Sequence, residues 1–490
     1  METFKCIDSQ IDAIYEIVMM TNWLPDMSEG SGPLYVRLAE RIEEAIASGT
    51  LPTGTKLPPQ RDLAFDIGVT IGTVGRAYTL VRERGLVSGE VGRGTFVLGG
   101  EADQQIAPAS IGIGGSAGTR AMVQPGKLRM DSTSAPAVGQ SEAIARLTHD
   151  ILRKYPDEVV DYTRVWPSAW QEAGSRWLRS GNWIPDPASV VSTNGAHAAV
   201  LGVITAMTAP GDRIAYEGLT FSPIARSANL IGRPSVLIGS DDHGADPEDF
   251  ERLCAQQHPK IAFLIPSMHN PTLAIMPLER RKAIIEVARK HSVWLIEDAV
   301  YGELLIDQPA TFAELAPERT FHVGSLSKAV AAGVRGGWVS CPANFAPRVQ
   351  TAHKMVTGGI PFLLGELASE LVLSGEADAI RANVRREIEA REAIARQSFA
   401  GLDFQSHHLA PFLWMKLPEP WLSTTFKSAA LNEGVLVNDE DEYKPGRTER
   451  IYHRIRVGFS APTTRQAVQS GFSTIRRLVD HANAGDDHYG

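Results

Sequence analysis

The chain has 490 residues, which is enough for about two or three domains with a large core. Its apolar fraction of 43% and charged fraction of 21% are those of an ordinary globular protein. The formal net charge of −9 argues against non-specific nucleic-acid binding by the whole surface, although a local basic face is compatible with it. The three cysteines lie far apart, without metal-ligand or disulfide-framework spacing. We therefore expect a reducing cytoplasm and no metal site.

Neither a membrane span nor a signal peptide is expected. The longest apolar stretch, residues 196–210, is too short and too interrupted to cross a bilayer, and it predicts a buried helix instead. Near the N-terminus, Asp12 and Glu16 interrupt the apolar runs and no small-residue cleavage site follows them. Residues 1–31 show weak periodicity, which predicts a poorly ordered tail.

Residues 32–99 have the pattern of a small helical domain that ends in a hairpin. Apolar side chains recur every four residues in the first predicted helix, at Leu34, Leu38, Ile42 and Ile46. A short second helix follows two turns, and Thr70 can cap a third helix. The apolar stripe of that third helix consists of Val74, Ala77, Tyr78 and Val81. A glycine-rich hairpin with Arg93 at its tip completes a predicted winged helix-turn-helix.

The segments LPPQRDLA, GVTIGTV and GRGTFV make this domain resemble the DNA-binding domain of GntR-type regulators. The resemblance implies that the third helix enters the major groove of operator DNA. It implies DNA contacts by Arg61, Thr70, Thr73, Arg76 and Arg93. Arg61 would hold or read the duplex, and Arg93 would reach a minor groove or a phosphate. Gly72 and Gly75 each cost the third helix about 1 kcal/mol relative to alanine, so we expect it to become fully ordered on DNA.

Two further regions follow this domain. Residues 100–127 are rich in glycine, alanine, serine and glutamine and predict a flexible linker. A coil of this length spans about 30 Å, enough for the DNA-binding domain to lie over a different subunit. In residues 128–482, apolar strands alternate with helical stretches, which predicts an α/β sheet with crossover helices.

Residues 321–338 place a lysine among small and hydroxyl-bearing residues. An apolar, strand-like run leads into the sequence SLSK, which ends at Lys328. A lysine amine that is neutral in a pocket can attack an aldehyde and form a Schiff base. Ser325, Ser327 and Arg335 supply donors of the kind that bind a phosphate. The alternative is a surface lysine in a serine- and glycine-rich loop.

Another stretch could also bind a phosphate, and an aromatic residue could stack on a ligand. Gly195, Ala196 and His197 start the expected buried helix, where backbone N–H groups and the helix dipole favour a phosphate. Phe221 follows a turn, where its ring could stack on a planar ligand. The alternatives are an ordinary strand–helix turn at Gly195 and a core position for Phe221.

Two buried strands are predicted to end in polar side chains. The first leads to Asn270, whose amide can donate to a phenolate oxygen, and Pro271 fixes the turn that follows. The second ends at Asp298, with Tyr301 three residues later. An α/β sheet places ligands at this end of its strands, and a carboxylate there can pair with a pyridinium N–H. A solvated loop aspartate is the alternative.

The motifs HNPT, EDAVY and SLSK…VRGG occur in the order and spacing of fold-type I aminotransferases, which this region resembles. The resemblance implies pyridoxal 5′-phosphate (PLP) as cofactor, a Schiff base on Lys328, and catalytic roles for Asp298 and Tyr301. It implies cofactor binding by Gly195, Ala196, His197, Phe221, Asn270, Asp298, Tyr301, Ser325, Ser327, Lys328 and Arg335, with Val300 on the second face of the ring. Asn270 and Tyr301 would contact the phenolic oxygen, and Asp298 the ring nitrogen.

The same resemblance extends to the effector site and to a partner subunit. HRIRVGFS resembles the strand whose arginine binds a substrate α-carboxylate, which implies Arg456, while Arg454 on the same strand face stays open. Tyr162 occupies the position from which the family sends a tyrosine into the neighbouring subunit's phosphate site, so a homodimer is expected. A helix over residues 376–398 and strands near Phe412 and Ile451 would form a smaller C-terminal subdomain.

Two departures from the family argue against ordinary transamination. WPSAWQEA replaces the usual pattern after the tyrosine, and Leu273 stands where the family has glycine; both are expected near the substrate side. A GntR-type domain, a linker and an aminotransferase-like domain together resemble the MocR subfamily of bacterial transcription regulators. That resemblance implies a PLP-dependent regulator that senses an amino-group effector. Its operon would serve the catabolism of rhizopine-like opines, ectoine derivatives or taurine, or the supply of vitamin B6.

Two alternatives remain at the level of the sequence. The first is an aminotransferase that carries a DNA-binding appendage, because the lysine, aspartate, tyrosine and arginine of the family are all present. The second is a DNA-binding dimer that has lost PLP. The second is disfavoured because none of the expected cofactor ligands is missing.

Overall fold

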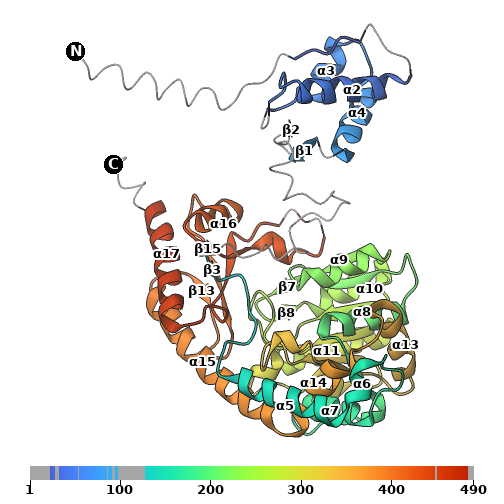
Figure 1. The fold of residues 1–490 in the computed structure, drawn as a ribbon, viewed down its shortest axis with the longest axis vertical. Coiled ribbons are helices and arrows are strands. Elements are labelled where there is room, and N and C mark those ends of the chain that lie inside the picture. Colours follow the sequence, from blue (N-terminus) through green and yellow to red (C-terminus); the bar gives the residue numbers. More distant parts are fainter. Residues whose placement is uncertain are drawn as a thin grey trace, which may run out of the picture. The chain divides into compact units, whose positions relative to one another are not determined.

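The computed structural model describes residues 23–27, 32–52, 55–84, 86–90, 94–97, 127–446, 448 and 450–483. The chain divides into two compact units, Met1–Gly114 and Gly115–Gly490 (Figure 1). The first is mainly helical in its described part, and the second is an α/β unit. Among the described residues, no helix is long and apolar enough to cross a membrane.

The N-terminal unit is a winged helix-turn-helix, as predicted. Its elements are α2 (Leu34–Ala47), α3 (Gln60–Asp66), α4 (Ile71–Glu83) and the antiparallel strands β1 (Val87–Glu90) and β2 (Gly94–Val97). The predicted stripe of α4 is buried: Val74, Ala77, Tyr78 and Val81. The Tyr78 hydroxyl donates to the Pro58 carbonyl at 2.8 Å, which satisfies the polar end of this core residue.

The stripe predicted for α2 holds only in part. Leu38 and Ile42 are fully buried, but Leu34 is 45% exposed because it is the first residue of the helix and lies beyond the packed turns. Trp23 and Met27 pack against the same core, and the Arg37 side chain donates to the Met27 carbonyl. Residues 23–27 of the predicted tail therefore contact the domain through Trp23 and Met27.

The C-terminal unit is built on a seven-stranded sheet. In spatial order the strands are β4 (Val190–Thr193), β12 (Gly337–Ser340), β11 (Thr320–Ser325), β10 (Trp294–Asp298), β9 (Ile261–Leu264), β5 (Ile214–Glu217) and β6 (Ser235–Ile238). β12 is antiparallel to both of its neighbours, and the other neighbouring pairs are parallel. The inner strands β5, β9 and β11 are buried on both faces, which explains why they read as continuous apolar runs.

Helices cover both faces of this sheet (Figure 1). One apolar cluster joins the sheet to α8 (Ala196–Met207), α9 (Ser222–Leu230) and α13 (Ala346–Thr357). A second cluster, on the other face, includes α10 (Pro247–Gln257) and α11 (Leu278–Lys290). Helices α5 (Gln140–Lys154), α6 (Pro156–Val160), α7 (Ser168–Trp177) and α14 (Phe362–Leu373) belong to the remaining part of this unit. The predicted buried helix is α8.

A smaller subdomain follows, with an antiparallel sheet of its own. Its strands are β13 (Phe404–Gln405), β14 (Phe412–Lys416), β17 (Arg454–Gly458) and β16 (Asn438–Asp439), in spatial order. Its helices are α15 (Glu376–Ser398), α16 (Ser423–Asn432) and α17 (Arg465–Asn483), coloured orange to red in Figure 1. The long helix agrees with the prediction over residues 376–398. The strand expected near Ile451 starts later, at Arg454, and Ile451 itself is exposed.

Residues 128–135, which we call the strap, join the smaller subdomain to the lysine loop. β3 (Leu128–Arg129) pairs in parallel with β15 (Val435–Leu436). Further on, the Met130 carbonyl accepts a hydrogen bond of 2.7 Å from the Gly458 N–H. The Ala135 N–H donates to the Ser327 carbonyl at 3.1 Å. The strap is thereby tied to both parts of the C-terminal unit.

Candidate cofactor and effector site

The sheet topology brings the predicted site residues to one edge. β4 leads to Gly195, β10 ends at Asp298, and β11 leads to Lys328. β12 runs in the opposite direction, so Arg335, two residues before its start at Gly337, lies at the same edge. The carboxyl ends of parallel strands thus assemble one site from segments far apart in the sequence.

A cavity of about 520 Å³ lies at this edge, a volume typical of small-molecule sites. Of the predicted residues, it is lined by Ala196, His197, Phe221, Asn270, Asp298, Val300, Tyr301, Ser325, Ser327, Lys328, Arg335 and Arg456. Gly195 directly precedes the lining residue Ala196. Tyr162 is not brought into this cavity, and its side chain is 87% exposed.

One end of the cavity has the geometry of an anion cradle. Gly195 caps α8 with a φ of 84°, and a Cβ on Gly337 would lie 2.6 Å from the Gly195 Cα, so both positions need glycine. The N–H groups in the first turn of α8 have no intrahelical acceptor and point out of the helix. Arg335 donates to the Asn194 carbonyl at 3.2 Å and adds a positive charge beside them. Together these groups form a site that fits a phosphate.

His197 and Phe221 adjoin this cradle. His197 Nε2 lies 3.0 Å from the Ser227 hydroxyl, and its ring meets the Phe221 ring edge-to-face at 6.4 Å. Burial, and then the charge of Arg335, lowers the pKa of His197, which favours a neutral ring. The pair can therefore present a largely apolar surface to a planar ligand.

Asp298 is buried at the other side of the cavity. One of its oxygens accepts a hydrogen bond of 3.1 Å from the Val300 N–H. Burial raises the pKa of Asp298 to about 6, although the Val300 N–H and the nearby Lys328 favour the charged form. A buried carboxylate of this kind gains from a further donor. A ring N–H of a bound ligand would provide one.

Lys328 has polar partners inside the cavity. Its Nζ donates to Thr133 Oγ1 at 3.1 Å and lies 5.4 Å from the centroid of the Tyr301 ring. Thr133 Oγ1 is also 2.6 Å from the Tyr301 hydroxyl. Thr133 was not predicted from the sequence. It lies 195 residues before Lys328, and a threonine in a serine-rich segment carries no motif.

Arg456 is held on several sides. Its guanidinium donates to Asn270 Oδ1 (2.9 Å), Asn438 Oδ1 (2.7 Å) and the Asp131 carbonyl (2.8 Å). The Phe412 and Tyr443 rings lie 5.4 and 5.1 Å from it. Within the described part of the chain its buried Nε–H has no hydrogen-bond partner. A buried guanidinium N–H that has no partner can donate a hydrogen bond to a carboxylate.

The structure distinguishes the surroundings of Arg456 from those of Arg454, whereas the sequence pattern could not decide between the two arginines. Arg454 donates to the Trp414 carbonyl at 3.4 Å and lies 3.6 Å from Asp403. It is not among the described residues that line the cavity. Both arginines lie on β17, but only the more central one faces Asn270.

A charged rim lies beyond Arg456 and was also missed. Asn438 donates to Glu442 at 2.6 Å, and Lys427 donates to the same carboxylate at 2.6 Å. Arg129 and Asp131 in the strap form a two-point ion pair with both distances at 2.9 Å. All five residues line the cavity. They come from the strap and the smaller subdomain, where no sequence motif marks them.

The substitution of leucine for glycine after the HNPT motif keeps the turn. Leu273 has a φ of 65°, a left-handed conformation that costs a non-glycine residue about 1 kcal/mol or more. Its N–H donates to the His269 carbonyl at 2.7 Å. Its side chain packs against the apolar cluster of Leu219, Trp414 and Tyr443, and the Tyr443 ring in turn lies beside Arg456. The departure therefore adds apolar bulk to this cluster, and Leu273 is not among the described residues that line the cavity.

The second departure lies elsewhere. The segment WPSAWQEA leads into α7, and none of its residues lines the cavity in the described chain. Trp170 is buried, donates to Glu366 at 2.7 Å, and accepts a bond from the Trp338 indole at its carbonyl. A Cβ on Gly365 would lie 2.5 Å from the Trp170 ring. Within this chain the segment contributes the buried Trp170 to the core, and its expected place near the substrate stays a prediction.

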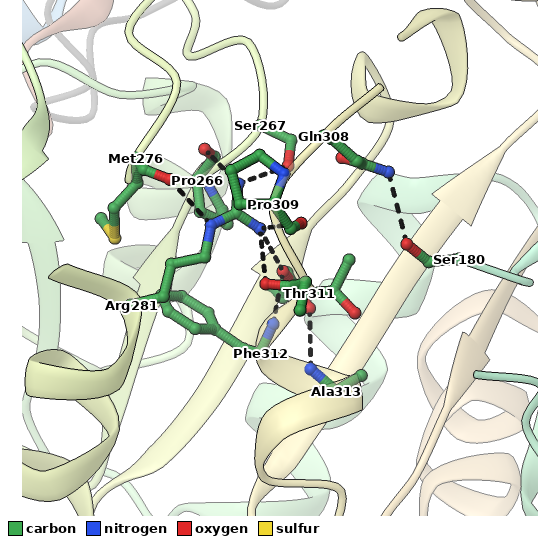
Figure 2. A network of polar contacts seen from close by, with 12 residues as sticks. Ser180, Pro266, Ser267, Met276, Arg281, Gln308, Pro309, Thr311, Phe312 and Ala313 are labelled. Carbon is green, nitrogen blue, oxygen red and sulfur yellow. Dashed lines mark hydrogen bonds and ion pairs between the residues drawn. The ribbon is translucent and has the colours of Figure 1, made fainter. Parts of the chain in front are cut away.

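The loop that carries Asn270 is fixed from behind by a buried arginine. Figure 2 shows the Arg281 side chain of α11 reaching the carbonyls of Met276 and Pro266, both at 2.9 Å, and the Ser267 hydroxyl at 3.0 Å. The Met276 N–H also donates to the Pro266 carbonyl at 2.9 Å. The loop is therefore closed at its base, and Asn270 is held toward the cavity.

In the N-terminal unit, the predicted DNA-contacting residues that are described gather at α3 and the start of α4. Arg61 and Arg76 are exposed. Thr70 caps α4, with its Oγ1 accepting from the Thr73 N–H at 3.2 Å, as predicted. Arg93 lies outside the described residues. A Cβ on Gly75 would come within 3.2 Å of the end of the flexible Gln60 side chain, whereas one on Gly72 would lie 3.8 Å from Thr70 Oγ1.

Comparison with known families identifies both units. Residues 162–475 match the family "Aminotransferase class I and II". The chain belongs to this family. Residues 34–97 match the family "Bacterial regulatory proteins, gntR family". Both resemblances predicted from the sequence are thereby confirmed, and the combination is the domain organisation expected for the MocR subfamily.

Relatives of this family member include regulators. The chain is 27% identical to the uncharacterized HTH-type transcriptional regulator YdeF of Bacillus subtilis, over 94% of this chain and 97% of YdeF. It is 26% identical to the probable rhizopine catabolism regulatory protein MocR of Rhizobium meliloti, over 69% and 71% of the two chains. The structure of the α-aminoadipate aminotransferase LysN of Thermus thermophilus aligns with a TM-score of 0.66 and 20% identity, over 74% and 94% of the chains. The last comparison supports the fold.

Proposed function

We propose that this protein is a PLP-dependent transcription regulator that binds operator DNA and senses a small amino-group effector. The proposal rests on one observation: the same chain carries a winged helix-turn-helix and a cavity that is lined by Lys328 and Arg456. The names of YdeF and MocR, which describe transcriptional and catabolic regulators, support it. By analogy the regulated genes would serve the catabolism of an amino compound.

The residues at the cavity fit PLP. The α8 cradle with Ser325, Ser327 and Arg335 suits the phosphate, and the buried Asp298 suits a pyridinium N–H. Asn270 and Tyr301 can contact a phenolic oxygen, while Phe221 and Val300 can pack on the ring faces. When bound, PLP would supply an aldehyde for a Schiff base with Lys328 and an electron-withdrawing ring.

The effector in this proposal is an amine that also carries a carboxylate. The amine competes with Lys328, and the carboxylate binds Arg456, whose Nε–H lacks a partner within the described residues. The Phe412 and Tyr443 rings restrict the movement of this guanidinium, so it can meet a carboxylate with little loss of side-chain entropy. Closure of the smaller subdomain on the effector would then change the DNA-binding state.

We further propose a homodimer. Tyr162 and its neighbours Val160 and Val165 are all more than 80% exposed, with values of 87%, 85% and 83%. Apolar side chains that lie together on a surface favour an interface. In such a dimer Tyr162 could enter the partner's phosphate site, and two DNA-binding domains would match two half-sites.

Transamination is the second candidate function. Lys328, Asp298 and Tyr301 all line the cavity, so the groups that the reaction needs are present. Against rapid turnover stands the departure from the family at Leu273, although this residue is not among the described residues that line the cavity. We expect slow turnover or none.

The decisive experiment follows the visible absorption of the purified protein together with operator binding. Wild type incubated with PLP should show a band of the lysine-bound cofactor that borohydride bleaches, and Lys328→Ala should lack this band. Candidate amino acids are then titrated while operator affinity is measured. A colourless wild type contradicts the cofactor proposal, whereas rapid release of keto acid favours the enzyme.

A further inference from the structure

Thr133 contacts two groups beside which an amino effector would react. Its Oγ1 accepts from Lys328 Nζ at 3.1 Å and lies 2.6 Å from the Tyr301 hydroxyl. The residue is 5% exposed, so water does not compete for these hydrogen bonds. The sequence motifs of the family do not include this threonine, and the function proposed above leaves it without a role.

The strap that carries Thr133 touches the cavity at a second point. Its Asp131 carbonyl accepts a hydrogen bond of 2.8 Å from the Arg456 guanidinium. Lys328 and Arg456 are the residues proposed to meet the amine and the carboxylate of an effector. The strap is therefore attached at both of these positions.

Chain connectivity gives the strap a further property. It is the first part of the C-terminal unit that the structure describes, and it follows the residues that lead from the DNA-binding domain. Its start is fixed to the smaller subdomain, where the Leu128 N–H donates to the Gly434 carbonyl at 2.7 Å. The strap thus lies on the covalent path between the cavity and the DNA-binding domain.

We propose that Thr133 is a positioning residue that couples the covalent state of Lys328 to the strap, and through the strap to operator binding. The inference rests on the proposed function. As a free amine or ammonium, Lys328 has hydrogens to donate to Thr133, as it does here. In a Schiff base, Lys328 has given up two hydrogens of its amine to water and its nitrogen is bonded to a carbon, so it keeps at most one hydrogen and its capacity to donate to Thr133 is reduced.

An amine effector reverses this change. Lys328 is displaced from the carbon by the incoming amine and recovers two hydrogens from it, so that atoms balance without any further reactant. The released Lys328 can again donate to Thr133. The strap is therefore held more firmly when the lysine is free and less firmly when it is bound, and the difference depends on one hydroxyl group.

The test uses the full-length protein in three states: without PLP, with PLP, and with PLP followed by a probe. Methoxyamine and aminooxyacetate both free the lysine, but only aminooxyacetate carries a carboxylate for Arg456. The variants are Thr133→Val and Thr133→Ala, which lack the hydroxyl, and Thr133→Ser, which keeps it. Thr351→Val, an exposed position on α13, is the matched control. Hydrogen exchange of peptides covering residues 128–135 and operator affinity are measured in each state.

In wild type, exchange of the strap should rise about threefold to tenfold on PLP loading, the factor that corresponds to one hydrogen bond, and fall back with either probe. Thr133→Val and Thr133→Ala should exchange fast in all three states, and their operator affinity should no longer change with the probe. Thr133→Ser and Thr351→Val should follow wild type.

Other results would overturn the inference. State-dependent exchange that persists in Thr133→Val and Thr133→Ala would mean that the hydroxyl carries no signal. Recovery with aminooxyacetate but not with methoxyamine would assign the control to Arg456 instead of Lys328. Unchanging exchange in a wild type that shows the visible band contradicts this inference alone, whereas absence of the band contradicts the proposed function as well.

Discussion

The Arg456 guanidinium donates a hydrogen bond of 2.9 Å to Asn270 Oδ1. The proposed carboxylate anchor and a proposed cofactor ligand are therefore in direct contact, although β17 belongs to the smaller subdomain and Asn270 to the loop after β9 of the large sheet. An effector carboxylate at Arg456 must share the guanidinium with this amide. Effector binding at Arg456 should therefore affect cofactor binding at Asn270, and the reverse.

Replacing Arg456 tests this contact. Arg456→Ala should leave PLP bound, because Asn270 keeps its place, but should weaken an amino-acid effector by about tenfold to a hundredfold, the value of charge-assisted hydrogen bonds. The measurement is a titration of candidate amino acids followed by visible absorption and operator binding. Arg454→Ala is the control on the same strand and should respond as wild type does. If the two variants respond alike, the carboxylate binds elsewhere.

Operator binding should depend on Arg61 and Arg76. Replacing either arginine with alanine should weaken operator binding by about 1–3 kcal/mol if that arginine contacts a base. If it contacts a phosphate instead, the replacement should reduce the number of counterions released on binding, measured from the salt dependence, by about one. Fluorescence anisotropy at several salt concentrations distinguishes the two cases. Arg82→Ala, an exposed arginine further along α4, serves as the control. Unchanged affinity in both test variants would mean that other residues read the groove.

The sequence predicted the parts of the site that follow directly from strands. Asn270, Asp298 and Lys328 each come after an apolar run, and a parallel sheet brings such positions to one edge. Thr133 and Asn438 could not be predicted in this way, because they reach the cavity through the packing of the strap and the smaller subdomain. Such packing cannot be inferred from the local periodicity of the sequence.

The differences from the sequence have a similar origin. Trp170 follows Tyr162 in a segment expected near the substrate, yet its side chain is buried in the core of this chain, because position along the chain does not decide which face of a helix is buried. Leu34 fitted the helical repeat and is nevertheless 45% exposed, because the repeat does not say where the neighbouring helix ends. The fold class followed from motif order and strand–helix alternation, which are properties of the sequence itself.

Asp298 should make stability depend on pH in the cofactor-free protein. Its folded-state pKa of about 6 lies above the value of about 3.9 for an unfolded chain, so between these values the folded state keeps a proton that the unfolded state releases. Stability from this group therefore falls as pH rises from about 4 to 6, by up to about 3 kcal/mol. Asp298→Asn removes the titration.

Urea unfolding of wild type and Asp298→Asn at pH 5 and pH 7 measures this effect. The advantage of the variant should be larger at pH 7, where wild type carries a buried charge. With PLP bound, a ring N–H would stabilise that charge, and the pH dependence of the difference should shrink. A difference that is the same at both pH values in the cofactor-free protein would show that Asp298 does not titrate in this range.

Two neighbouring arginines on α11 offer a test of how the Asn270 loop is held. Arg281 is fully buried and donates to the Pro266 and Met276 carbonyls, whereas Arg280 pairs with the half-exposed Asp241. Burial lowers the pKa of Arg281, which reflects the cost of keeping this charge away from water. Its loss leaves several buried carbonyl groups without donors.

Arg281→Met should therefore destabilise the protein by about 3–5 kcal/mol, the cost of leaving buried partners unpaired. Arg280→Met should cost about 0–1 kcal/mol, as expected for a surface ion pair. Urea unfolding of both variants gives the comparison, and the visible band after PLP incubation reports on the loop. If Arg281→Met unfolds like Arg280→Met, the network in Figure 2 does not hold the loop, and the position of Asn270 must depend on its contact with Arg456 instead.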